Sequence, residues 1–329
     1  MDRKDETSWI GLDIGGANIK WADESGTTII PFELWRRADQ LGKELGLLRD
    51  RVGQVDRVAV TMTGELADCF ESRKQGVRFI VDQVEVAFSE QHPIYYQTNG
   101  RFVEAEQAAG DWEETAAANW HAMASWIAKE NSDRNLILLD VGSTTTDIIP
   151  ISQGVVIAKG RTDFDRLRFG ELVYCGVVRT PIHSVVQHLQ VGNHKIPIAR
   201  EYFANVQDAF LVLGWVPQND DSHFTADGRG NRFQDAKRRL AKMVCLDASQ
   251  CSDDSIRSIA QQIAVALAEK IIDGINEVTE QPFEKVSFVP AGEGHWFARR
   301  ILNQDIDGIS IGQPAPTFRL DELSKLEPA

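Results

Sequence analysis

The sequence repeats the stretch Gly11-Leu-Asp-Ile-Gly-Gly-Ala-Asn-Ile-Lys20 as Leu138-Leu-Asp-Val-Gly-Ser-Thr-Thr-Thr-Asp147, with the same order of residue types. In each copy an apolar strand delivers an aspartate, which is followed by an apolar residue, a glycine and small or hydroxylated residues. The two aspartates, Asp13 and Asp140, are separated by about the length of one domain. A repeat at this spacing predicts two related lobes, each opening with a β-hairpin.

The residue types in both turns are those that bind an anion. Glycines and small side chains let backbone N–H groups point into a concave turn, and hydroxyl groups add further donors. A lysine can meet a phosphate oxygen as a point charge. Ordinary glycine turns are the alternative reading, which two matched copies disfavour. The predicted phosphate-binding residues are Gly15, Gly16, Asn18, Lys20, Gly142, Ser143, Thr144 and Thr145.

The aspartates of the two hairpins are candidate ligands for Mg²⁺. This ion prefers oxygen ligands and keeps several waters, so an aspartate at a strand end can hold it directly or through water. We therefore expect Asp13 and Asp140 to bind Mg²⁺. The sequence has neither G-x-x-x-x-G-K-[ST] nor a G-x-G-x-x-G after a strand, which argues against P-loop and dinucleotide folds.

Length and charge narrow the class of protein further. A chain of 329 residues favours two domains, which we place at residues 1–130 and 131–329. The net charge of −14 argues against a nucleic-acid partner. No apolar run approaches the ~20 residues of a membrane helix, and the first residues lack a signal core. We expect a cytoplasmic protein with small-molecule substrates and no membrane partner. Both a monomer and a homodimer are compatible with the sequence.

Hydrophobic periodicity predicts the main elements. The stretch 135–140 has no polar alternation, which is typical of a strand covered on both faces. Apolar residues recur every three or four positions over 255–278, which predicts a long helix with a core-facing stripe. Other helices are expected over residues 34–52, 69–88, 105–129, 169–178, 204–213 and 233–244, a β-rich stretch over 182–199 and a last strand over 306–311.

Three motifs together resemble those of the acetate-and-sugar-kinase/heat-shock-chaperone/actin superfamily. Its two phosphate motifs are similar to the hairpins, and its adenosine motif is similar to Val289-Pro-Ala-Gly-Glu-Gly294. The resemblance implies an α/β, two-lobed actin-like or sugar-kinase-like ATPase fold built from duplicated ribonuclease-H-like domains. Glu293 separates two glycines that are usually adjacent and places a carboxylate near the base or phosphates, so ATP is a less favoured ligand than the superfamily suggests.

Further segments resemble one family within that superfamily. They are Thr61-Met-Thr-Gly-Glu-Leu-Ala-Asp-Cys-Phe70, Phe169-Gly-Glu-Leu-Val-Tyr-Cys-Gly-Val-Val-Arg-Thr-Pro181 and the Ser-Thr-Thr-Thr-Asp of the second hairpin. These are similar to the hydantoinase/oxoprolinase-like family of tetrahydromethanopterin-linked one-carbon metabolism. The resemblance implies a transferase of methanofuran or methylofuran biosynthesis. It would join an aminomethylfuran-methyl diphosphate to the phenol of a γ-glutamyl-tyramine or tyrosine-type substrate and release diphosphate, with Mg²⁺ as cofactor.

Under this resemblance the candidate residues take roles. Asp147 or Glu171 would accept the phenol proton, and Asp13 would act through the metal. Glu65 is a weaker candidate for the role of proton acceptor, with an ordinary loop cap as the alternative. Tyr174 would line the side of the developing cation or serve only in packing, and Arg179 would bind a carboxylate or phosphate or serve only at a strand entry. The expected substrate-binding residues are Thr63, Gly64, Glu65, Tyr174, Arg179, Gly292 and Glu293. An ATP-dependent small-molecule kinase, with Asp147 or Asp140 as base and metal ligand, and a nucleotide-gated interaction module are the rival functions.

Overall fold

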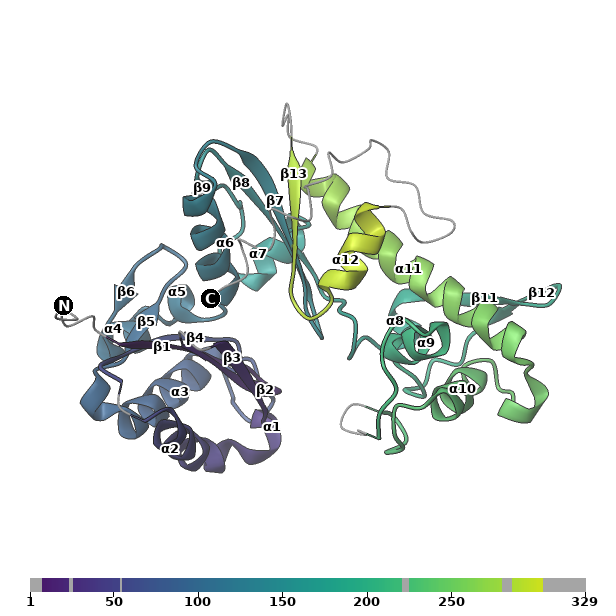
Figure 1. Cartoon of the computed structure of the whole chain (residues 1–329), viewed down its shortest axis with the longest axis horizontal. Helices are drawn as coiled ribbons and strands as arrows, with labels where there is room; N and C mark the ends of the chain where they lie inside the picture. The colour runs from purple at the N-terminus through teal and green to yellow at the C-terminus, as the bar shows by residue number, and fades with distance from the viewer. Residues whose placement is uncertain (1–7, 24–25, 54, 221–224, 280–285, 304–329) are drawn as a thin grey trace, which may run out of the picture.

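A computed structural model describes residues 8–23, 26–53, 55–220, 225–279 and 286–303. The chain forms two lobes, each built on its own sheet, with the β1–β3 lobe and the β7–β8 lobe facing one another across the molecule (Figure 1). Within the described ranges, no helix is long and apolar enough to cross a membrane.

The sheet of the first lobe has the strand order β3-β2-β1-β4-β5-β6. Strands β1 to β3 form an antiparallel meander, and β4 and β5 continue the sheet in parallel with β1. The bounds are β1 (Trp9–Ile14), β2 (Asn18–Asp23), β3 (Gly26–Pro31), β4 (Arg57–Met62), β5 (Ile94–Tyr96) and β6 (Phe102–Val103).

Helices cover one face of this first sheet. Alternate residues of β1, namely Ile10, Leu12 and Ile14, are buried in one core with α2 (Leu41–Val52) and α3 (Arg73–Ala87). Between them, Gly11 is exposed and Asp13 is only partly buried. This two-residue alternation puts Asp13 on the face opposite the core. The short α1 (Leu34–Arg37) and a 3-10 turn (Ala38–Gln40) precede α2, and a second such turn (Ser89–Gln91) follows α3.

The second sheet has the order β10-β8-β7-β13, with β9 paired to β8. Leu136 and Leu138 of β7 pack in a core with α6 (Asn119–Glu130). Ile137 and Leu139 pack on the other side with α11 (Asp253–Thr279) and its neighbours. The prediction of a strand covered on both faces is therefore confirmed. The strands are β7 (Asn135–Val141), β8 (Thr146–Ser152), β9 (Val155–Val156), β10 (Leu172–Val173) and β13 (Ser287–Ala291).

Beyond this sheet a helical group completes the second lobe around α11 (Figure 1). Its stripe of apolar residues is buried along the whole helix, as the periodicity predicts. The remaining elements are α7 (Asp163–Arg168), α8 (Ile182–Val185), β11 (His188–Val191), β12 (His194–Pro197), α9 (Val206–Leu213), α10 (Phe233–Lys242), a 3-10 turn (Ala248–Gln250) and α12 (His295–Leu302).

The two lobes share a topology. In the first, the antiparallel hairpin β1–β2 has β4 as the parallel neighbour of β1. In the second, the hairpin β7–β8 has β13 as the parallel neighbour of β7. The predicted α/β fold with two related lobes is confirmed. Packing associates α6 with the second sheet, although it lies on the N-terminal side of the predicted boundary at residue 130.

Two predicted helices are wrong. Residues 105–129 form three helices, α4 (Ala105–Gly110), α5 (Trp112–Thr115) and α6, because the backbone leaves helical geometry at Asp111, where ψ is 46°, and again at Ala117, where φ is 50°. Residues 169–178 contain β10 and a loop instead of a helix, because Gly170 has a φ of 69°. The β-rich stretch 182–199 holds α8 before the β11–β12 hairpin. The expected strand at 306–311 lies outside the described residues.

Candidate functional site

The turn of the first hairpin is closed by one backbone hydrogen bond. The Gly15 amide donates to the Asn18 carbonyl at 2.9 Å. The strand register then places Asp13 directly opposite Lys20. Lys20 Nζ lies 3.4 Å from Asp13 Oδ2, and Thr61 Oγ1 on β4 donates to Asp13 Oδ1 at 3.2 Å. The neighbouring strands therefore hold Asp13 between a cation and a hydroxyl group.

The turn of the second hairpin has the same construction. The Gly142 amide donates to the Thr145 carbonyl at 2.8 Å, and Asp140 lies opposite Asp147. The side chains of Ser143, Thr144 and Thr145 stay partly exposed. The two predicted phosphate turns are thus equivalent in backbone, whereas the position of Lys20 is taken by Asp147.

A loop flanks each turn, after the strand that runs parallel to the aspartate strand. Beside the first turn, the amides of Thr63 and Gly64 donate to the Ile14 carbonyl, both at 2.9 Å. Beside the second, the Gly294 amide donates to the Val141 carbonyl at 2.7 Å. Gly64 and Gly294 are therefore equivalent, and Thr63 corresponds to Glu293. The predicted substrate-binding segments 63–65 and 292–293 are the matching rims of the two turns.

Glycine is required at position 292. Its φ is 80°, in the left-handed region, and a Cβ there would collide with Asp140 Oδ1 and with the Val141 carbonyl. The loop that carries Glu293 can therefore lie directly on the Asp140 strand end only because residue 292 has no side chain.

Electrostatics show that both turns share one environment. Partial burial lowers the pKa of Lys20, but Asp13, Asp140 and Glu293 outweigh it and raise that pKa overall. Burial, followed by repulsion from Asp147, raises the pKa of Asp140, and Asp13 adds to the effect while Lys20 opposes it. Charged groups from both hairpins and from the 292–294 loop therefore converge between the lobes.

Arg166 completes this cluster and was not among the sequence-predicted site residues. It is almost fully buried, and its Nη2 donates to Asp147 Oδ1 at 2.5 Å and to the Glu171 carbonyl at 3.2 Å. Its guanidinium carbon lies 4.1 Å from the centre of the Trp120 ring. An arginine in the polar run 161–168 carries no sequence signal, because only the fold brings it beneath the second hairpin.

The Glu171 carboxylate is engaged within its own lobe. It accepts hydrogen bonds from the backbone amides of Lys159 at 2.6 Å and Gly160 at 2.8 Å. Burial raises the pKa of Glu171, and these two amides oppose the shift. These contacts tie the 159–160 loop to β10. Tyr174 is exposed on the surface.

Glu65 is buried at the rim of the first turn. Only 1% of the residue is exposed, Oε1 lies 3.7 Å from Arg73 Nη2, and Oε2 has no hydrogen-bond partner in the described structure. Burial raises the pKa of Glu65 to about 7, against the opposing effect of Arg73. Asp163 of the second lobe and Asp13 raise it further, so Glu65 belongs to the same charged region.

The donor set of the aspartates fits a hard divalent cation. Asp13 and Asp140 offer only oxygen atoms. Burial and then repulsion from Asp147 raise the pKa of Asp140, and a bound cation would offset that repulsion. Within the described ranges, no group of three or more His, Cys, Asp and Glu residues is placed to hold a metal by itself. Mg²⁺ typically meets one or two carboxylates and completes its shell with water and substrate phosphates.

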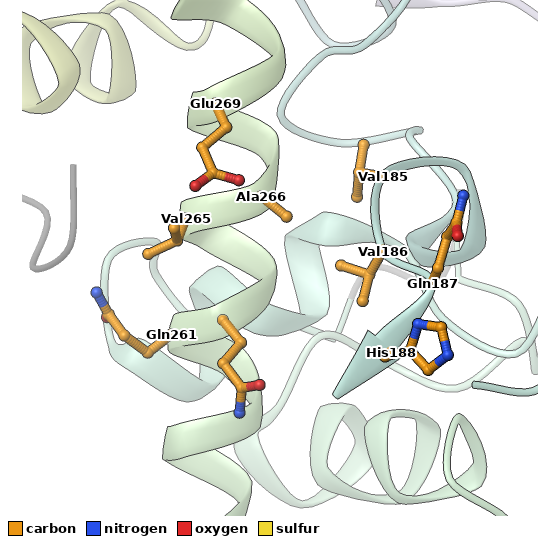
Figure 2. Close-up of a pocket in the computed structure, with 9 residues that line it drawn as sticks. Val185, Val186, Gln187, His188, Gln261, Val265, Ala266 and Glu269 are labelled. Atoms are coloured by element: carbon orange, nitrogen blue, oxygen red, sulfur yellow. The ribbon is translucent and has the colours of Figure 1, made fainter. Parts of the chain in front are cut away.

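A cavity of about 420 Å³ lies elsewhere in the second lobe. Figure 2 shows Val265 and Glu269 of α11 on one side of it and Val186 and His188 on the other. None of the predicted site residues lines this cavity. The convergent charges of the two hairpins therefore define the candidate active site.

Comparisons with known proteins identify relatives. A family model for hydantoinase/oxoprolinase matches residues 56–311. A Methanocaldococcus jannaschii protein named (4-{4-[2-(gamma-L-glutamylamino)ethyl]phenoxymethyl}furan-2-yl)methanamine synthase is 36% identical over 326 residues, covering 95% of this chain and 96% of that protein. A Methanococcus vannielii protein of the same name is 36% identical over 155 residues, 47% of this chain and 69% of its own.

Among solved structures, an archaeal actin homologue matches 97% of this chain and 96% of its own, at 11% identity and a TM-score of 0.40. The sequence relatives are named as synthases, so the prediction of an enzyme is confirmed. The extent of the family match, together with the relative of nearly equal length, settles the family. The chain belongs to the hydantoinase/oxoprolinase family.

Proposed function

We propose that this enzyme condenses an aminomethylfuran-methyl diphosphate with the phenol of a γ-glutamyl-tyramine or tyrosine-type acceptor, in methanofuran or methylofuran biosynthesis. The phenol oxygen forms a bond to the methylene carbon beside the furan ring. The bond from that carbon to diphosphate breaks, and the phenol proton passes to a carboxylate of the site. The names of the sequence relatives describe an enzyme with an ether product of this kind.

One observation carries the proposal: two turns with the residue types of anion-binding sites and Lys20 converge with carboxylates at a single site. The furan oxygen delocalises positive charge that develops on the methylene carbon. The enzyme therefore has mainly to stabilise the departing diphosphate and to position the phenol. One pair of unit charges at 4 Å is worth about 4 kcal/mol at an effective dielectric of 20, and a diphosphate offers several such pairs.

Each group of the site has a task in this proposal. The backbone N–H groups of the two turns and Lys20 bind the diphosphate. Asp13 and Asp140 would hold Mg²⁺, which supplies the additional positive charge that a diphosphate leaving group needs. Asp147 accepts the phenol proton, and Arg166 fixes the position of its carboxylate. Glu171 is the alternative base, although its carboxylate is bonded to two backbone amides.

The test is turnover with the two proposed substrates. The enzyme is incubated with the furan diphosphate, γ-glutamyltyramine and Mg²⁺, and diphosphate release is followed together with the mass of the ether product. We expect release only when both substrates are present. Asp13→Ala and Asp140→Ala should abolish it, whereas Asp133→Ala, at an exposed position distant from the turns, should not. No release by the wild type with either a tyramine or a tyrosine acceptor would overturn the proposal.

The rival kinase function makes a different prediction. Titration calorimetry with ATP and with diphosphate, each in the presence of Mg²⁺, separates the two. Because Glu293 places a carboxylate in the loop beside the second turn, we expect diphosphate to bind more tightly than ATP. Tight ATP binding without diphosphate binding would favour the kinase.

A further inference from the structure

Glu293 carries a carboxylate at the edge of the candidate active site. It lies in the loop between β13 and α12, beside the end of the β7–β8 hairpin (Figure 1). The residue is exposed to solvent. Within the described ranges, no ion pair or hydrogen bond engages its carboxylate. The oxygen atoms of Glu293 are therefore open to a ligand.

The other carboxylates of the site are engaged within the protein or assigned to another task. Asp13 has a lysine as its partner, Asp147 has an arginine, and Glu171 has two backbone amides. Glu65 is buried, and Asp140 is the second proposed ligand of the metal ion. A positively charged group of a substrate would therefore meet its carboxylate partner at the 292–294 loop.

The nearby cations of the protein do not neutralise Glu293. Lys20 forms its ion pair with Asp13, and its attraction to Glu293 acts over a longer range. The guanidinium carbon of Arg179 lies 5.3 Å from the centre of the Trp35 ring in the first lobe. Burial raises the pKa of Glu293, and Lys20 opposes the shift. A cation bound at this carboxylate would stabilise its ionised form further.

The backbone on both sides of Glu293 is fixed to the second turn. Gly292 lies against the Asp140 side chain, and the Gly294 amide donates to the Val141 carbonyl at 2.7 Å. The equivalent residue of the first lobe, Thr63, has its hydroxyl oxygen 3.3 Å from the place that a Cβ on residue 15 would take. The first turn therefore has a neutral hydroxyl group at its rim, and the second has a negative charge at the equivalent position.

A carboxylate at this position suits a ligand that carries both signs of charge. A purely anionic ligand, such as free diphosphate, is repelled by Glu293. The donor proposed above is different, because its furan ring has a diphosphate group on one side and an aminomethyl group on the other. An alkyl amine of this kind is protonated at neutral pH, as a lysine side chain is. The donor therefore matches a site with anion-binding turns at one end and a free carboxylate at the other.

We propose that Glu293 binds the ammonium group of the donor, an inference that rests on the function proposed above. The turns and Lys20 hold the diphosphate, and Glu293 fixes the opposite end of the furan ring. The ammonium group of the γ-glutamyl acceptor is the less suitable partner. It shares its carbon atom with a carboxylate, which Glu293 repels.

The test compares two donors in steady-state kinetics of diphosphate release, with γ-glutamyltyramine and Mg²⁺ present. One is the aminomethylfuran-methyl diphosphate, and the other is furan-2-ylmethyl diphosphate, which lacks the aminomethyl group. Glu293→Gln should lower kcat/KM for the first donor about 10- to 100-fold, the usual worth of a hydrogen bond to a charged group. Most of this loss should appear in KM, because the ammonium group is remote from the reacting carbon.

The second donor should respond in the opposite way or not at all. It has no ammonium group to lose, and Glu293→Gln removes a charge that repels its diphosphate. Glu293→Asp keeps the charge and should retain part of the preference for the first donor. Glu269→Gln is the matched control, because Glu269 is an exposed carboxylate at the separate cavity beside α11 (Figure 2). It should change kcat/KM for neither donor, and circular dichroism checks the folding of every variant.

Two results would overturn the assignment. One is a Glu293→Gln variant that uses the aminomethyl donor as well as the wild type does. The other is an equal loss for both donors, which would mean that Glu293 does not recognise the ammonium group. Either result leaves the proposed function standing as long as the wild type releases diphosphate. A wild type that releases none from either donor would remove the proposed function itself, and this inference with it.

Discussion

The two hairpins have the same backbone and opposite electrostatics. Each turn is closed by an equivalent glycine amide, and each places an aspartate opposite the same position of the next strand. In the first hairpin that position is Lys20, which pairs with Asp13. In the second it is Asp147, which repels Asp140. The two turns therefore share one backbone, while the residue at one position gives them different charges.

Arg166 compensates part of the negative charge of the second hairpin. The first hairpin neutralises its aspartate with a lysine on the adjacent strand, whereas the second needs a cation from outside the hairpin. The guanidinium of Arg166 fills that need for Asp147 and is buried against Trp120. Asp140 has no comparable ion pair among the described residues, and this difference is the physical reason for expecting a metal ion near it.

The largest effect is expected when the charge pairing between Arg166 and Asp147 is removed. Arg166→Met removes the partner of Asp147 and leaves a carboxylate in a partly buried site, so we expect the free energy of unfolding to fall by about 3–5 kcal/mol. Urea denaturation measures the change. Adding Asp147→Asn should recover part of the loss, because the uncompensated charge is then gone. A double variant no more stable than Arg166→Met alone would show that Arg166 acts through Trp120 instead.

The next prediction compares the loops beside the two turns. The residue that follows the equivalent glycine, Gly64 or Gly294, is the buried Glu65 in the first loop and the exposed His295 in the second. Unfolded Glu65 loses its proton near pH 4.5 and folded Glu65 near pH 7. The folded state therefore binds the proton more tightly, and stability falls as pH rises through this window, by about 3 kcal/mol in all. Above pH 7 the loss is complete.

Glu65→Gln should remove this pH dependence. Measured by urea unfolding, the variant should gain stability relative to the wild type between pH 5 and pH 8. His295→Gln serves as the control and should change little, because that side chain is exposed. A constant difference between Glu65→Gln and the wild type across this range would contradict the prediction.

A third prediction sharpens the comparison at the aspartates themselves. Asp13→Asn and Asp140→Asn each keep the size of the side chain and remove its charge. If both hairpins bind one diphosphate together with its metal ion, each variant should lower the rate of diphosphate release about 100-fold. This loss corresponds to an increase of about 2.7 kcal/mol in the activation free energy. Steady-state kinetics measures this loss. Normal turnover in one of the two variants would show that the hairpins do not share a metal.

The smallest expected effect concerns the rims. Gly292→Ala forces a side chain into left-handed backbone and against Asp140, so we expect a loss of about 1–2 kcal/mol in the free energy of unfolding. Gly11→Ala is the matched control, because a Cβ there meets open space and the backbone is extended. Thermal denaturation of both variants gives the comparison. Equal melting temperatures would mean that the 292–294 loop accommodates the added methyl group without a loss of stability.

Local patterns predict much of the fold. The hairpins, the doubly covered β7 and the long α11 follow from residue types within one element and its turn. The equivalence of Lys20 and Asp147 can be read by aligning the two hairpins. The contact between Arg166 and Asp147 cannot, because it depends on how α7 packs beneath β8. Similarly, residues 169–178 do not form a helix, partly because Gly176 must lie against the backbone of the second turn.

The docking of α6 on the second sheet has a mechanical consequence. The core of the first lobe ends at Ala116, and α6 begins at Asn119, so the chain passes between the sheets at residues 116–118 within the described ranges. Ala117 has a φ of 50° in the middle of this passage. A swing of one lobe against the other would then pivot about this short crossing and change the spacing of the two turns, while both sheets and their helices move as rigid pieces.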